Sequence, residues 1–206
     1  MLRIARRAVP IGLLLVVLTQ SSALAATVNI QATNTGTMFF FSPKSANVSP
    51  GSTALWTNTG SVNHTTTSDT TMPVTWDSGS LNVGATFSFV FTAAGKYTYH
   101  CMFHKSLGMV GTISVPMKAS PPSGPAGTIF TITVASVNAS GTLVYDIQMK
   151  VPGGTFKNWM TGLTSKSATF DSSGMATGTY QFRARVRDTV SAKATLFSNA
   201  KSIMVT

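Results

Sequence analysis

The stretch Tyr97-Thr98-Tyr99-His100-Cys101-Met102-Phe103-His104-Lys105-Ser106-Leu107-Gly108-Met109 contains the only cysteine of this 206-residue chain. Within it, Cys101, His104 and Met109 follow the spacing Cys-x2-His-x4-Met. The residues just before Cys101 alternate as a strand does, which places the thiol on the inward face at the strand's end and His100 on the opposite face. The stretch therefore predicts a buried thiol that leads into a short loop carrying two further donor side chains.

A thiolate, two imidazoles and a thioether are the donors of one kind of mononuclear copper site, in which His2Cys forms a plane and Met is a long axial ligand. The loop lacks one imidazole, and His64 is the candidate for it. We expect the metal ligands to be His64, Cys101, His104 and Met109. His100 is expected to be a surface histidine, because strand alternation turns it away from Cys101. A Cys/His3 zinc site would need His100 to face inward, so this alternation argues against zinc. A buried, inert cysteine is the alternative for the thiol.

The composition predicts an all-β protein. Only 10% of the residues are charged, no glutamate is present, and short Thr-, Val-, Phe- and Tyr-rich runs alternate with Gly, Pro, Asn and Ser. In the first half, strands are expected at 27–32, 37–41, 52–58, 64–68, 86–92, 96–101 and 110–115. The short turn at 93–95 predicts that its two flanking strands pair as a hairpin.

A domain boundary is expected at Pro116, followed by a Pro/Ser/Gly linker over 117–125. Beyond it, strands are expected at 129–135, 143–151, 156–159, 167–170, 179–187 and 200–205. The run 179–187 alternates strictly and predicts that Tyr180, Phe182, Ala184 and Val186 face a core while its arginines stand in water.

Residues 1–25 are typical of a cleaved signal peptide. Three arginines precede an apolar run at 11–18, and Ala23-Leu24-Ala25 is a suitable cleavage site. The apolar run is too short to span a bilayer, so we expect a protein without a transmembrane segment, located in the periplasm or outside the cell. The net charge of +10 is uneven: residues 26–116 hold three lysines and two aspartates, whereas 117–206 hold nine basic residues and three aspartates.

The order of motifs from Trp56 through His64, Asp77-Ser78-Gly79 and Cys101 to Val110-Gly111-Thr112-Ile113 resembles the cupredoxin family of type 1 blue copper proteins. The loop spacing is similar to that of plastocyanin and pseudoazurin. The resemblance implies a Greek-key β-sandwich over 26–116, one copper ion, and the four ligands named above. It also implies a redox partner protein that docks at an apolar patch near His104. Members commonly have an asparagine after the first histidine ligand, where this chain has Thr65.

Residues 126–206 resemble a fibronectin type III or immunoglobulin-like β-sandwich through Tyr145-Asp146-Ile147-Gln148, Trp159 and the run 178–187. The leading hypothesis is a secreted carrier of single electrons rather than an enzyme, because three histidines and one cysteine cannot build a multicopper or dinuclear centre. The alternative is a non-redox, copper-sequestering surface module with an adhesion domain. A basic second domain favours contact with a cell envelope or another anionic surface, and nucleic acid is not expected as a partner.

Overall fold

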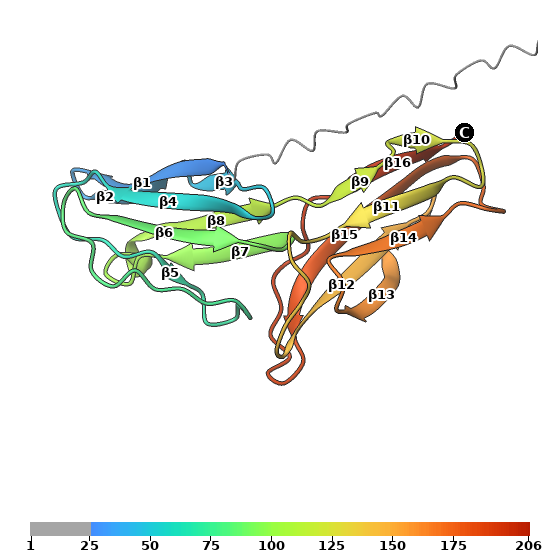
Figure 1. Ribbon diagram of the computed structural model, residues 1–206. Coiled ribbons are helices and arrows are strands. Elements are labelled where there is room, and N and C mark those ends of the chain that lie inside the picture. Colours follow the sequence, from blue (N-terminus) through green and yellow to red (C-terminus); the bar gives the residue numbers. More distant parts are fainter. Residues whose placement is uncertain (1–25) are drawn as a thin grey trace, which may run out of the picture.

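The computed structural model describes residues 26–206, so the predicted signal peptide at 1–25 lies outside the described residues. This part of the chain forms sixteen β-strands and one short 3-10 helix, η1 (Lys105–Leu107), with no α-helix. The strands build two β-sandwiches arranged end to end (Figure 1). The all-β prediction is confirmed. No helix in residues 26–206 has the length and apolar character needed to cross a membrane.

The first sandwich consists of two four-stranded sheets. One has the order β2-β1-β4-β6, and the other has the order β3-β8-β7-β5. Their strands are β1 (Thr27–Thr35), β2 (Met38–Ser42), β3 (Ser45–Asn47), β4 (Ser52–Asn58), β5 (Thr67–Ser68), β6 (Thr86–Phe91), β7 (Gly95–His100) and β8 (Val110–Val115).

The second sandwich packs a five-stranded sheet, β10-β16-β15-β12-β13, against a three-stranded sheet, β14-β11-β9. Its strands are β9 (Lys118–Ser120), β10 (Ser123–Gly124), β11 (Ile129–Thr133), β12 (Leu143–Lys150), β13 (Lys157–Leu163), β14 (Ser167–Asp171), β15 (Gly178–Asp188) and β16 (Lys201–Val205). The four residues of β15 predicted to face the core are at most 2% exposed, which confirms that alternation.

The predicted hairpin between the strands at 86–92 and 96–101 is wrong. β6 pairs with β4, whereas β7 pairs with β5 and β8, so the short turn crosses from one sheet to the other. Ala93 and Ala94 in this turn are buried, and Ala94 donates its backbone N–H to Val134 of the second domain at 2.7 Å. The turn is therefore held by the neighbouring domain rather than by a hairpin ladder.

The segment 117–125 also differs from the expected linker, because it contains β9 and β10. These strands pair with β11 and β16 of the second sandwich. The prolines between them are compatible with this placement, since both strands are short and lie at sheet edges. Only two residues, Pro116 and Met117, thus separate β8 from β9.

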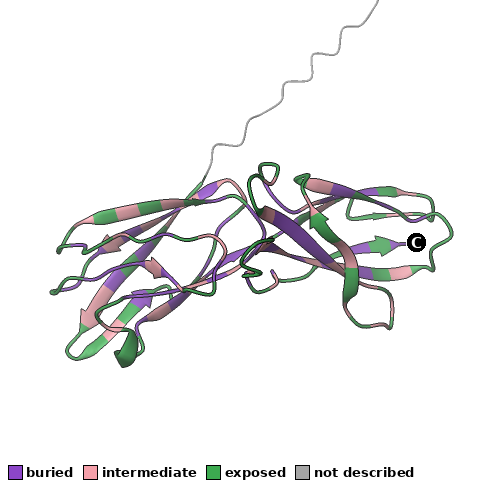
Figure 2. Ribbon diagram, turned by 90° about the horizontal axis from the view of Figure 1, so that it is seen from below, coloured by how far each residue is buried: buried purple, intermediate pink, exposed green. Residues whose placement is uncertain are grey.

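Direct backbone contacts join the two sandwiches. Besides the bond from Ala94, Ser136 N–H donates to Thr92 O at 2.8 Å, and Lys96 N–H donates to Leu196 O at 2.9 Å. Buried apolar residues form one cluster that runs through both sandwiches, as the buried stretches in Figure 2 indicate. The base of the first sandwich is therefore closed by the second.

Candidate metal centre

The loop between β7 and β8 is folded into a compact ring by its own backbone. Cys101 N–H donates to Met109 O at 3.1 Å, His104 N–H donates to Cys101 O at 3.2 Å, and Met109 N–H donates to His104 O at 3.1 Å. Gly108 closes η1 with φ of 85°, a left-handed conformation that glycine adopts without strain. These bonds fix Cys101, His104 and Met109 on one short loop at the end of β7 remote from the second domain.

His64 comes from a different loop, between β4 and β5. It exchanges backbone hydrogen bonds with Leu81, at 3.2 Å and 2.8 Å. The side chain of Asn58 fastens the same loop by donating to Val62 O and Leu81 O, both at 2.8 Å, and by accepting from Gly60 N–H at 2.9 Å. Gly60 lies so close to the His64 ring that a Cβ there would be 2.9 Å from Nε2.

The two loops bring three donor atoms together. Cys101 Sγ lies 3.4 Å from His104 Nδ1 and 3.9 Å from His64 Nδ1, and the donor atoms of the three residues all lie within 4.8 Å of one another. Cys101 and His64 are fully buried, and His104 is partly exposed. The structure thus brings together three of the four residues expected from the sequence and places the fourth, Met109, fully buried on the same loop.

Burial keeps the imidazoles in the form that binds metals. It lowers the pKa of His64 from 6.5 to about 4, with a further contribution from the neighbouring His104. Burial also lowers the pKa of His104. Both rings are therefore neutral near pH 7, and a neutral imidazole offers a lone pair to a metal.

Thr65 joins the two loops through its side chain and its backbone. Its hydroxyl accepts the N–H of Met102 at 2.8 Å, and its own N–H points at Cys101 Sγ at 3.3 Å. The hydroxyl is also 3.0 Å from Thr67 Oγ1, which donates to Asp77 Oδ1 at 2.9 Å. Thr65 thus links the loop of His64 to the loop of Cys101, at the position where family members commonly have an asparagine.

The prediction that His100 is a surface histidine is wrong. Its side chain does turn away from Cys101, but it is only 8% exposed because Asp69 covers it. His100 Nδ1 lies 2.7 Å from Asp69 Oδ1, and Lys105 Nζ lies 3.2 Å from the same oxygen. The interaction ties the loop that holds Asp69 to the end of β7, so His100 is a structural partner outside the donor cluster.

Phe39 is a site residue that the sequence reasoning missed. Its ring stacks on that of His104 with the centroids 3.8 Å apart and the planes within 4° of parallel. In β2, Phe39 is followed by Phe40 and Phe41, so the run Phe39-Phe40-Phe41 offered no signal for which ring would reach the site. The stack limits the orientations open to the His104 imidazole.

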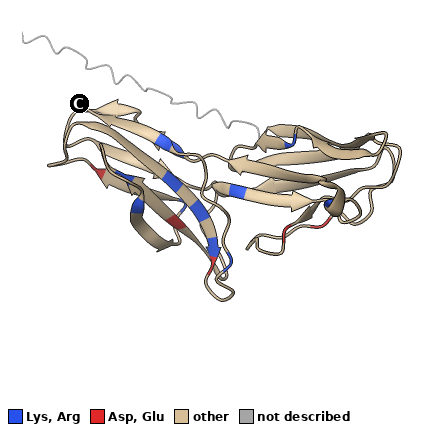
Figure 3. Ribbon diagram, turned by 180° about the vertical axis from the view of Figure 1, so that it is seen from behind, with Lys and Arg blue, Asp and Glu red and all other residues tan. Residues whose placement is uncertain are grey.

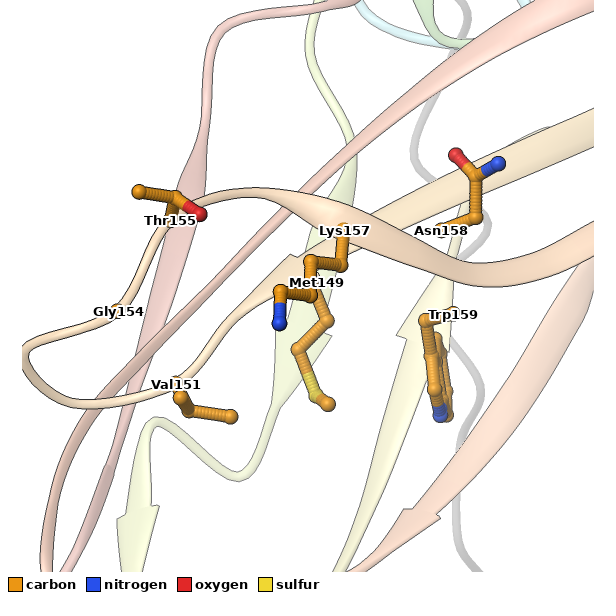
Figure 4. Close-up of a pocket in the computed structure, with 7 residues that line it drawn as sticks. All are labelled: Met149, Val151, Gly154, Thr155, Lys157, Asn158 and Trp159. Atoms are coloured by element: carbon orange, nitrogen blue, oxygen red, sulfur yellow. The ribbon is translucent and has the colours of Figure 1, made fainter.

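The second sandwich has a hollow of about 520 Å³ beside β13, which Figure 4 shows with its lining side chains. Met149, Val151 and Trp159 supply apolar walls, and Lys157 is the one charged residue. The lining has no histidine, cysteine or carboxylate, so this hollow lacks the donors of the cluster around Cys101.

Comparison with known proteins agrees with this geometry. The sequence profile of copper binding proteins of the plastocyanin/azurin family matches residues 26–116. A purple cupredoxin from Nitrosopumilus maritimus is 31% identical, with 98% of that chain and 43% of this one covered and a TM-score of 0.38. Residues 26–116 form a cupredoxin domain of the plastocyanin/azurin family. Plastocyanin from Dryopteris crassirhizoma is 25% identical over 100% of its length and 43% of this chain, with a TM-score of 0.39.

Pseudoazurin from Methylobacterium extorquens AM1 is 20% identical, with 77% of its length and 45% of this chain covered and a TM-score of 0.39. Each of these three structures matches less than half of this chain. Cupredoxins bind one copper ion, and His64, Cys101 and His104 are positioned to form such a site. The residues fit the metal, because a buried thiol and two neutral imidazoles are donors that copper accepts in either oxidation state.

Proposed function

We propose that this protein is an exported carrier of single electrons with one type 1 copper site, whose ligands are His64, Cys101, His104 and Met109. The observation that carries the proposal is the convergence of one thiol and two neutral imidazoles within 4.8 Å inside a rigid sandwich. Copper, when bound, supplies one-electron exchange between Cu(I) and Cu(II). Met109 would be the fourth donor, because it is fully buried on the loop that holds Cys101 and His104.

The protein's own residues keep the donor geometry nearly constant. The loop ring, the Asn58 anchor and the Thr65 hydroxyl all fix backbone positions around the donors without a metal. A site that is already formed needs little rearrangement when the charge of the metal changes. This preorganisation supports electron transfer rather than transport of a metal that must be released.

His104 lies at the proposed docking surface for a redox partner. Met102, Phe103 and Leu107 flank it on the same loop and are 60%, 54% and 61% exposed. Exposed apolar side chains gathered on one loop are typical of a protein contact site. The domain has only two acids, Asp69 and Asp77, so docking there depends on a small apolar contact rather than on a strong negative charge.

The second domain is proposed to be a fibronectin type III-like module that contacts an anionic surface of the cell envelope or its surroundings. Its two packed sheets and its nine basic residues against three aspartates support this role. We propose no catalytic function for it. The signal-like residues 1–25 support export of the whole protein.

Redox titration tests the proposal. One equivalent of copper should bind, and it should be reduced by ascorbate and reoxidised by ferricyanide through repeated cycles without loss of metal. Fast self-exchange between oxidised and reduced protein, measured by NMR line broadening, would support a carrier. Copper that binds but is released on each reduction would instead support the alternative, a sequestering module without redox cycling.

A further inference from the structure

A row of arginines lies along β15 on the outer face of the five-stranded sheet. Arg183, Arg185 and Arg187 alternate with buried residues, so their side chains share the face turned away from the core. The basic positions along this strand are visible in Figure 3. Alternate residues of a strand are about 7 Å apart, so the row spans about 13 Å.

The neighbouring strand β12 and two aromatic rings hold these arginines in place. Asp146 accepts from Arg185 Nε at 3.1 Å and from Arg187 Nε at 2.8 Å, and Gln148 accepts from Arg183 Nε at 2.9 Å. The Arg183 guanidinium also lies 4.2 Å from the ring centre of Phe156. The arginines face outward as expected, but they also bond to protein partners and are only partly exposed.

Phe197 completes the arrangement. Its ring lies between two guanidinium groups, with the carbons of Arg183 and Arg185 each 4.8 Å from its centre. Side chains that are already fixed lose less conformational entropy when they bind a partner. The row is thus preorganised, as an anion-binding surface should be.

The charge of this face is positive despite the one carboxylate within it. Asp146 is 3% exposed and lies beneath the guanidinium groups, while the side chains of Arg185 and Arg187 are 33% and 27% exposed. Lys150 follows Asp146 and Gln148 at alternate positions of β12 and faces the same side. Four cations therefore share this face with a single acid that solvent scarcely reaches.

We propose that this face binds an extended acidic polysaccharide, whose sulfate or carboxylate groups lie along the row formed by Arg183, Arg185, Arg187 and Lys150. Arg183 and Arg187 each donate Nε and Nη2 hydrogen bonds to Gln148 or Asp146, and a guanidinium group has five N–H donors, so further donors are left for such oxyanions. A row along one strand fits a linear chain of anionic groups better than it fits a bilayer. Phe156 and Phe197 already stack on arginines, so their rings are not offered to nucleic-acid bases.

This proposal specifies the anionic contact of the second domain and does not depend on the copper chemistry. The row also leaves the redox surface free. β7 starts at Gly95 beside the second domain and ends at His100 next to the metal loop, about 17 Å further along the first sandwich. A protein held through β15 would therefore present the loop of His104 away from the polysaccharide.

The test compares two charge-matched double variants of the whole protein. Arg183→Gln with Lys150→Gln removes two cations from the row and leaves no buried charge unpaired, because Arg183 bonds to the neutral Gln148. Lys118→Gln with Lys166→Gln removes two cations near the other sheet, where both residues line a separate hollow. Binding to heparin and to polygalacturonate is measured by calorimetry over a range of salt concentrations, with and without copper.

We expect the row variant to bind at least about tenfold more weakly, and the slope of log binding constant against log salt concentration to be smaller in magnitude by about two. The affinity of the control variant should stay within about twofold of that of the natural protein. Arg185→Lys keeps a cation opposite Asp146 and should weaken binding about threefold with the slope unchanged. The separate heparin and polygalacturonate arms show whether sulfate or carboxylate is preferred. Equal losses in the two double variants, no binding near 150 mM salt, or tighter binding to poly(dT) or phosphatidylglycerol vesicles would each overturn the proposal.

Discussion

Replacing Thr65 by valine tests whether its hydroxyl fastens the two loops of the metal site. Valine has nearly the shape of threonine, so the change removes one oxygen and leaves Met102 N–H without the acceptor it has at 2.8 Å. Loss of the partner of a partly buried donor costs about 1–2 kcal/mol. We expect the free energy of unfolding of the copper-free protein to fall by this amount, as measured by urea denaturation.

Thr65→Ser is the matched control, because it keeps the hydroxyl and should lose less than half as much. The bond between the hydroxyls of Thr65 and Thr67 adds a second test. Because the two side chains share one network, the double variant with Thr67→Val should be less destabilised than the sum of the single variants by about 0.5 kcal/mol or more. Equal stability of Thr65→Val and the natural protein would refute the fastening role.

Three further perturbations follow from the structure. Burial holds the pKa of His64 at about 4, so the unfolded chain binds a proton on this ring more readily than the folded protein does. The copper-free protein should therefore lose about 3 kcal/mol of unfolding free energy as the pH falls from 6.5 to 4, and an unfolding free energy that stays constant over this range would contradict the argument. Gly95→Val would place a Cβ 2.5 Å from Thr195 Oγ1 of the second domain, so it should destabilise the contact between the domains by about 1–3 kcal/mol. Calorimetry should then show two unfolding transitions, and a single transition at the natural temperature would contradict this expectation. Phe39→Leu removes the stack on the His104 ring, which is worth about 1 kcal/mol. Competition with a chelator should therefore show severalfold weaker copper binding, whereas the control Phe39→Tyr keeps the stack and should keep the natural affinity.

Local alternation and spacing carried much of the prediction. The strands β4 and β8 have the bounds expected from the sequence, and the inward position of Cys101 followed from the parity of a single strand. Three expected donors also meet in space. These features depend on a few neighbouring residues, so a sequence expresses them directly.

Features that depend on contacts between distant parts of the chain could not be predicted from local alternation and spacing. The turn at Ala93 and Ala94 had the length of a hairpin, but its backbone bonds to the second domain and its strands belong to different sheets. His100 has the parity of a surface residue, yet it is buried and bonds to Asp69, which is 31 residues away in the sequence. The arginines of β15 likewise depend on partners contributed by other segments.

The visible spectrum after addition of Cu(II) to the processed protein tests the proposed site most directly. If Cys101 is the thiolate ligand beside His64 and His104, one equivalent of Cu(II) should give an intense visible band from thiolate-to-copper charge transfer. The band should be absent in Cys101→Ser and retained in His100→Gln, because His100 points away from the donor cluster. A colourless copper complex, or an intense band that survives in Cys101→Ser, would contradict the account.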